Sequence, residues 1–520
     1  MRGMLNARGV MVLTALVTLV GATTTNAKSA VPSSQPESPA HVKARVSPAH
    51  ATKPCALPGI PAQRLDQVVD ASNTLQPPLA ADARIRIATK IAAPCPDLAR
   101  DLFQSAFDQA ESVEPETAFK LAPKSWLADS RISYAAHGYS QQMDRLSLQS
   151  RAVLGMVPLD AKKAIQLFQR MTPPRLSAST CANVFVPDVS IYYEALEKIV
   201  ALMKAQRSPN PNEDQQAPFR ALQEATGATT SPLQLTPLAK LLEEVNLTVP
   251  ELSALTTSLA TAIEGFQSDD NSFYSGGNYP AVKAKVRLLL FLGKQQIPTA
   301  GLTHAFRDYF DRSLSAPHCD NNEPKDLKAL VTLYESFNRS PATSDQGIEA
   351  LSIPTSLPPI EPGPNIGEYW LGPRTAELLI DAKHLNFDDN WRPLTNADRQ
   401  TPEWQDRVHH LLNDMDNWNA SDESDAADYY HQRCILLYRT LASLPPGALY
   451  DRVVAAWTTT FAESTLQWDH PAEWYFEVSM FLESSKRDSK GPTPPSALRA
   501  LKNSSNRRLQ AIGVLKEFLQ

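Results

Sequence analysis

The chain has 520 residues, of which 42% are hydrophobic and 20% charged, which is ordinary for a folded globular protein and argues against a wholly disordered one. Its net charge of −6 is unevenly spread: residues 1–60 hold six basic residues and one acidic residue, so the remainder, with 44 basic and 55 acidic residues, carries −11. A surface of that charge repels phosphate backbones, so we expect no nucleic-acid partner.

The first 27 residues have the layout of a cleaved signal peptide. Arg2 and Arg8 form a positive start, residues 10–22 form an uncharged and mostly apolar run, and Thr25-Asn26-Ala27 offers small residues for cleavage. The alternative is a retained N-terminal anchor, although the run is short for a permanent membrane helix. No later segment approaches ~18 uninterrupted apolar residues. We therefore expect an exported, secreted chain, periplasmic or extracellular, without stable membrane insertion of its mature part.

Residues 28–60 are rich in Ser, Pro and Ala and lack apolar periodicity, which predicts a disordered leader. Between 61 and 350 we expect an N-terminal helical-repeat domain, because apolar residues recur at three- and four-residue spacing. The 42 prolines against 19 glycines also suit helices punctuated by proline. The expected helices cover a stripe from Ile85 to Ile91, a segment starting at Pro96, and 146–156, 161–171, 187–205, 236–244, 248–266, 280–294, 298–314 and 325–337, with loops at 206–218 and 267–278.

A proline-rich segment divides this region from the C-terminal part. Five prolines within 352–367 exclude a helix and predict an extended connector, so we place a linker at 351–367 and a C-terminal helical domain at 368–520. The helices expected there are one from Pro402 capped by Thr401, and others at about 422–443, 449–461, 471–481 and 496–518. Four tryptophans lie at helical spacing with aliphatic residues, which predicts that they belong to the core: Trp404, Trp418, Trp457 and Trp474.

Two short segments recur along the chain. Residues 99–104 return as 164–169, 65 residues later, and residues 176–183 return as 314–321, 138 residues later. These gaps are close to two and four units of ~34 residues, the period of helix-turn-helix repeats. Residues 160–171 resemble the second helix of a tetratricopeptide or pentatricopeptide unit, and the whole resembles the secreted helical-repeat proteins of bacteria. The resemblance implies an all-α fold of helical hairpins stacked as an α-solenoid, in one or two modules.

The chain has five cysteines, an odd number for an exported protein. Cys434 falls on an apolar helical stripe, so we expect it to be a buried thiol. We expect Cys55 and Cys95 to form a disulfide, which closes a 40-residue loop worth about 4 kcal/mol in the chain-entropy model. Four cysteines still allow three pairings. If the 138-residue recurrence reflects an open solenoid, Cys181 and Cys319 should lie too far apart to pair.

The common catalytic and binding signatures are absent from the sequence: it holds no HExxH, GxSxG, Walker, GxGxxG or CxxC pattern. We therefore predict no catalytic residue, no metal site and no cofactor. The adjacent pair His409-His410 is a poor chelate, because neighbouring side chains on a helix point about 100° apart.

These observations favour a non-enzymatic, exported scaffold that presents a concave face to a protein or peptide partner. The alternative is an all-α glycan-active enzyme with a site near Asp388, Asp389 and Trp391, since carboxylate pairs and tryptophan rings serve sugar chemistry. Adjacent aspartates project in different directions, which weakens a shared role for the two carboxylates.

Overall fold

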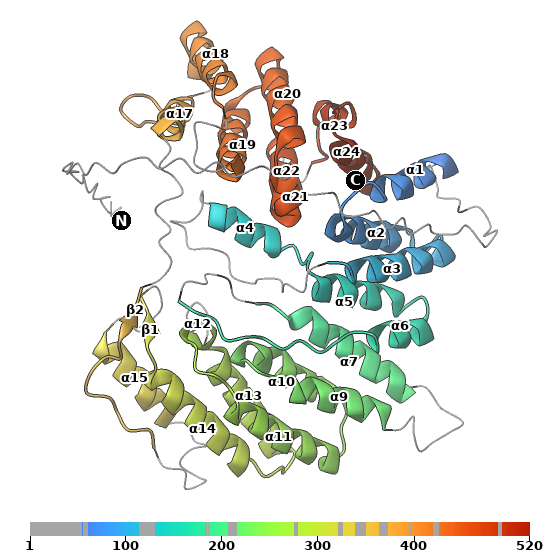
Figure 1. Cartoon of the computed structure of the whole chain (residues 1–520), viewed down its shortest axis with the longest axis vertical. Coiled ribbons are helices and arrows are strands. Elements are labelled where there is room, and N and C mark those ends of the chain that lie inside the picture. Colours follow the sequence, from blue (N-terminus) through green and yellow to red (C-terminus); the bar gives the residue numbers. More distant parts are fainter. Residues whose placement is uncertain are drawn as a thin grey trace, which may run out of the picture. The chain divides into compact units, whose positions relative to one another are not determined.

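The computed structural model describes residues 55, 61–113, 131–181, 185, 187–205, 216–274, 279–320, 326–338, 350–362, 373–395, 397–419, 426–486 and 491–520. The predicted signal peptide at 1–27, and the leader at 28–60 apart from Cys55, lie outside the described residues. The described part is all-α, as predicted, and its sheet structure consists of two strands of two residues each (Figure 1).

The described elements are almost all helices (Figure 1). They are α1 (Ala62–Ser72), α2 (Pro77–Ile91), α3 (Pro96–Ala110), α4 (Arg131–Tyr139), α5 (Arg145–Met156), α6 (Ala161–Phe168), α7 (Ser190–Ala205), α9 (Ala217–Gly227), η2 (Pro232–Gln234), α10 (Leu235–Glu244), α11 (Val249–Glu264), α12 (Asp270–Tyr274), α13 (Pro280–Lys294), α14 (Ala300–Ser315), β1 (His318–Cys319), α15 (Leu327–Asn338), β2 (Ile360–Glu361), α17 (Pro373–His384), η5 (Asp398–Gln400), α18 (Pro402–Asp416), α19 (Ala426–Ser443), α20 (Ala448–Glu463), α21 (Leu466–Asp469), α22 (Pro471–Ser484), α23 (Pro495–Lys502) and α24 (Arg507–Leu519).

Most helices predicted from apolar periodicity are confirmed, and α13 has the predicted bounds. The predicted cap of α18 is also present, since Thr401 Oγ1 accepts a hydrogen bond from the Trp404 amide at 3.2 Å. The single last helix expected at 496–518 is wrong, because the chain breaks between α23 and α24. Asn506 ends the break: its side-chain oxygen accepts from the amides of Arg508 and Leu509 and so starts α24.

Helices from the two ends of the described chain contact each other. α1 and α2 pack against α24, and α2 and α4 pack against α22. Residues 52–520 accordingly form one compact unit. The domain boundary at 351–367 stays a prediction, since contacts between the two parts do not test whether either part folds alone. Among the described helices, none is both long and apolar enough to cross a membrane.

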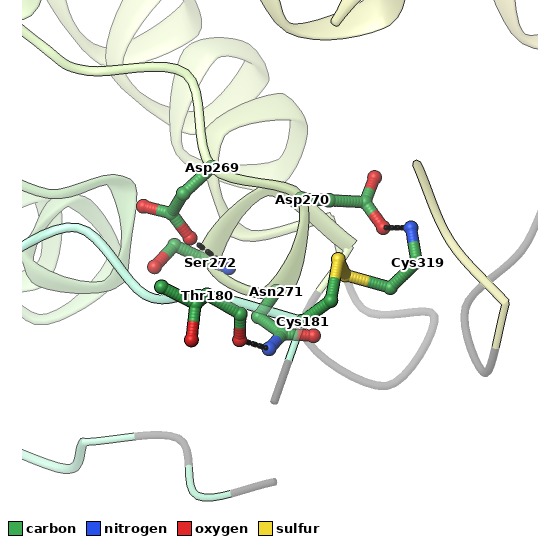
Figure 2. The surroundings of a disulfide bond; sticks show 7 residues. All are labelled: Thr180, Cys181, Asp269, Asp270, Asn271, Ser272 and Cys319. Carbon is green, nitrogen blue, oxygen red and sulfur yellow. Dashed lines mark hydrogen bonds between the residues drawn. A yellow bond between two sulfur atoms is a disulfide. The ribbon is translucent and has the colours of Figure 1, made fainter. Parts of the chain in front are cut away.

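Cys181 and Cys319 do not lie far apart, as they would at equivalent positions of an open solenoid. The two cysteines form a disulfide, with their Cα atoms 5.3 Å apart, although 138 residues separate them (Figure 2). The helices between them turn the chain back on itself, so the two recurring segments do not occupy distant, equivalent places in an open superhelix. This disulfide counts against the 138-residue repeat register.

Side chains of helix α12 hydrogen-bond to the backbone at or beside both cysteines of this disulfide, as Figure 2 shows. Asp270 Oδ2 accepts a hydrogen bond from the Cys319 amide at 2.7 Å, and Asn271 Nδ2 donates to the Thr180 carbonyl at 2.6 Å. Asp269 caps the helix by accepting from the Ser272 amide at 2.7 Å. The predicted loop at 267–278 therefore contains a five-residue helix that fixes the bridge.

The proline-rich connector contains no helix over its described part, 351–362, and it reaches the same disulfide. Its strand β2 pairs in parallel with β1, with Ile360 opposite His318 and Glu361 opposite Cys319. The His318 amide donates to the Pro359 carbonyl at 2.8 Å. A short ladder thus attaches the connector beside Cys319.

Helices α3 and α5 approach closely at Gly155. A Cβ atom added to Gly155 would overlap the ring of the buried Phe103. We expect Gly155→Ala to lower the free energy of unfolding by about 1–3 kcal/mol, because the ring must move within a filled core. Urea denaturation measures the change.

The matched control is Gly301→Ala in α14, where an added Cβ meets no atom within 4 Å. That variant should be neutral or slightly stabilising, within about 1 kcal/mol, because alanine favours the helix. Truncating the ring in a Gly155→Ala/Phe103→Leu double variant should cost less than the two single changes combined. Additive costs would contradict a steric origin at this contact.

Candidate functional site

The residues proposed for glycan chemistry lie on the exposed loop that follows α17. Phe387 and Pro393 form an isolated antiparallel bridge that closes this loop. Asp388 Oδ1 accepts hydrogen bonds from the amides of Asn390 at 2.9 Å and Arg392 at 2.8 Å. Asp388 therefore holds the shape of the loop, which is the local role of an aspartate in a tight turn.

The other two residues of that set are directed outward. The Asp389 side chain is 81% exposed, with an oxygen 3.7 Å from His384 Nδ1. Trp391 is 61% exposed, has a left-handed backbone with φ 59°, and lies 5.7 Å from Lys383 Nζ, measured to the ring centroid. The structure brings Asp388, Asp389 and Trp391 onto one small loop but gives the two carboxylates different surroundings. The glycan site stays a prediction.

Cys55 and Cys95 are joined in a disulfide, with Cα atoms 5.6 Å apart. Cys95 is the buried N-cap residue of α3, so the bridge holds residue 55 at the corner between α2 and α3. Cys434 is buried and forms no disulfide, as predicted. The four tryptophans assigned to the core are all buried, as predicted.

A groove with a volume of about 740 Å³ lies between α2, α5 and α24. Ile85, Leu154 and Leu519 contribute apolar walls. Its charged lining residues are all basic: Arg86, Lys90 and Arg151. A groove that combines apolar walls with a few placed charges has the composition of a ligand site.

The positions of the three cations are fixed by neighbouring groups. The buried carboxylate of Asp82 lies 2.7 Å from Arg86 Nε and 2.7 Å from Arg151 Nη2. Because that carboxylate stabilises the charged guanidinium, it raises the pKa of Arg86 above its ordinary value. Lys90 Nζ donates to the Phe518 carbonyl at 2.6 Å. The single carboxylate of Asp82 therefore faces two of the three cations, and Lys90 is held by a backbone carbonyl.

These groove residues are not predicted from the sequence pattern. The apolar stripe from Ile85 to Ile91 predicts the helix but says nothing of the basic residues on it. The four-residue spacing of Arg86 and Lys90 was visible and places them on one helix face. Arg151 comes from α5, and only the tertiary packing brings it beside them.

Comparisons with known proteins do not assign a family or a function to the chain. Searches against protein-family models, curated proteins and solved structures find no match to the chain.

Proposed function

We propose that this protein is an exported helical scaffold that binds an acidic, extended peptide segment of a protein partner in the groove between α2, α5 and α24. The observation that carries the proposal is the charge of the groove. Its lining holds three cations and no acid, in a chain whose residues after 60 carry −11. Basic side chains in a groove with apolar walls favour carboxylates flanked by apolar residues.

The arrangement of the helices supports a scaffold of stacked hairpins. Described helices that are near one another in the chain pack together repeatedly: α2 with α3, α5 with α6, α6 with α7, and α7 with α9. Hairpins stacked in this way build the extended surfaces that helical-repeat proteins use for binding. The two disulfides support export, since such bonds persist in oxidising compartments.

The expected ligand preference follows from the three cations. A fluorescein-labelled peptide of alternating Glu and Leu should bind the purified chain, and a matched Lys and Leu peptide should not. Raising the salt concentration from 0.05 to 0.3 M should weaken the binding, because added ions screen exposed charges. Fluorescence anisotropy measures both effects.

Charge reversal in the groove should reduce this binding. We expect Lys90→Glu to weaken binding of the acidic peptide about tenfold, which corresponds to ~1.4 kcal/mol. Lys198→Glu is the control: it makes the same charge change at an exposed position of α7 beside Glu197. Equal binding by wild type and both variants would overturn the proposal, and equal weakening by both would show a general charge effect rather than a groove site.

A further inference from the structure

Three ionisable side chains from two neighbouring helices converge inside the C-terminal part of the fold. His431 lies on α19, and Glu473 and Glu477 lie on α22, which packs against α19. The four-residue spacing of the two glutamates puts their carboxylates on one face of α22. That face is turned toward His431, because one donor atom from each of the three residues lies within 4.8 Å of the others.

The distances within this cluster suit a shared ion. His431 Nδ1 lies 2.7 Å from Glu477 Oε1 and 3.9 Å from Glu473 Oε1. Ligands about 2.1 Å from a tetrahedral metal ion lie about 3.4 Å from one another. The two observed distances lie on either side of that value, so small side-chain rotations would bring the three donors into coordination.

The cluster is buried. His431, Glu473 and Glu477 are 2%, 4% and 2% exposed. Burying carboxylates costs free energy, which a cation of matching charge can offset. A divalent ion matches two carboxylates and accepts the lone pair of a neutral imidazole.

Residues around the cluster pack against its three donor side chains but are not among the proposed ligands. The Tyr134 ring of α4 meets the His431 ring edge-on, with centroids 4.6 Å apart. Gly138 lets α4 approach α22, since an added Cβ would lie 2.8 Å from the Glu473 backbone. Cys434, one turn after His431, hydrogen-bonds to Glu477. Outer contacts of this kind orient the ligands of metal sites.

We propose that His431, Glu473 and Glu477 bind one divalent transition-metal ion, with Zn²⁺ the best match. A nitrogen donor together with two carboxylates suits zinc, whereas Ca²⁺ and Mg²⁺ prefer sets made of oxygen ligands alone. The burial of the cluster assigns the ion a structural role: it joins α19 to α22 beneath α4. The site is separate from the basic groove and does not depend on the function proposed for it.

The test uses the full chain, stripped with a chelator and then titrated with Zn²⁺ alone. We expect one ion per chain by calorimetry and elemental analysis, and a melting temperature several degrees higher with Zn²⁺ than after chelation. Millimolar Mg²⁺ or Ca²⁺ should not displace the ion. A chelated chain that stays folded by circular dichroism and binds no Zn²⁺ would overturn the proposal.

Two variants locate the ion. His431→Gln and Glu477→Gln should each weaken Zn²⁺ binding at least tenfold. His410→Gln, which changes an exposed histidine on α18, should bind as wild type does. If a variant fails to fold, the ligands can be identified instead from the visible spectrum of Co²⁺ bound to the wild-type chain. Absorption bands typical of tetrahedral Co²⁺, without a thiolate charge-transfer band, would support ligation by histidine and carboxylates. Wild-type affinity in folded His431→Gln, or thiolate bands from Co²⁺, would contradict the site.

Discussion

Replacing Cys181 and Cys319 together by alanine should lower the free energy of unfolding by about 3–5 kcal/mol. The bridge spans 138 residues of chain, and a cross-link over so long a loop removes much of the entropy of the unfolded state, ~5 kcal/mol in the chain-entropy model. It also holds α12 and the short β1–β2 ladder at one place. Urea denaturation of the oxidised variant and wild type measures the loss.

The matched variant is Cys55→Ala/Cys95→Ala, which opens a loop of 40 residues. The same model gives ~4 kcal/mol for that loop, so the second variant should be affected less than the first. If only the Cys181→Ala/Cys319→Ala variant unfolds with reduced cooperativity, the larger loss of stability lies in the region around α12. An unchanged unfolding midpoint in the first variant would contradict a native bond between Cys181 and Cys319.

Truncating Trp457 should be about as damaging. Trp457 is 1% exposed, and its ring stacks on Phe481 with centroids 3.3 Å apart and an interplanar angle of 12°. It also contacts Phe461 of its own helix. We expect Trp457→Ala to lower the free energy of unfolding by about 3–5 kcal/mol, because it leaves a large cavity between α20 and α22. Urea denaturation followed by circular dichroism measures the change.

Trp468→Ala is the control for this substitution. Trp468 is 63% exposed and lies under the guanidinium of Arg508, 3.4 Å from the ring centroid. Losing that cation–π contact at the surface should cost no more than about 1 kcal/mol. Similar losses in the two variants would mean that α20 and α22 do not share one filled core.

The helices could be predicted where they are long enough to repeat their apolar pattern. Apolar periodicity sufficed for α13, and Pro402 with the Thr401 cap marked the start of α18. Helix α12 has five residues, fewer than two turns, so no periodicity marks it. The contact between Cys181 and Cys319 depends on how all the helices between them turn, which local patterns do not specify.

The candidate sites were harder to predict for the same physical reason. Arg86 with Lys90, and Glu473 with Glu477, are each visible as pairs four residues apart. Their partners, Arg151 and His431, come from other helices about 40 to 65 residues away in the sequence. Motif searches examine closely spaced residues, so they find sites built on one segment and miss sites assembled by packing.

The packing of α1 and α2 against α24 limits the order in which parts of this protein can fold. While the polypeptide is being made, Leu65 and Leu79 emerge more than 400 residues before Ile512 and Leu515, which lie on the helix that covers α1 and α2. The apolar surface between these helices can close only after α24 has been synthesised. Folding intermediates that lack α24 therefore expose the apolar face that α1 and α2 turn toward it, and an exposed apolar face promotes aggregation.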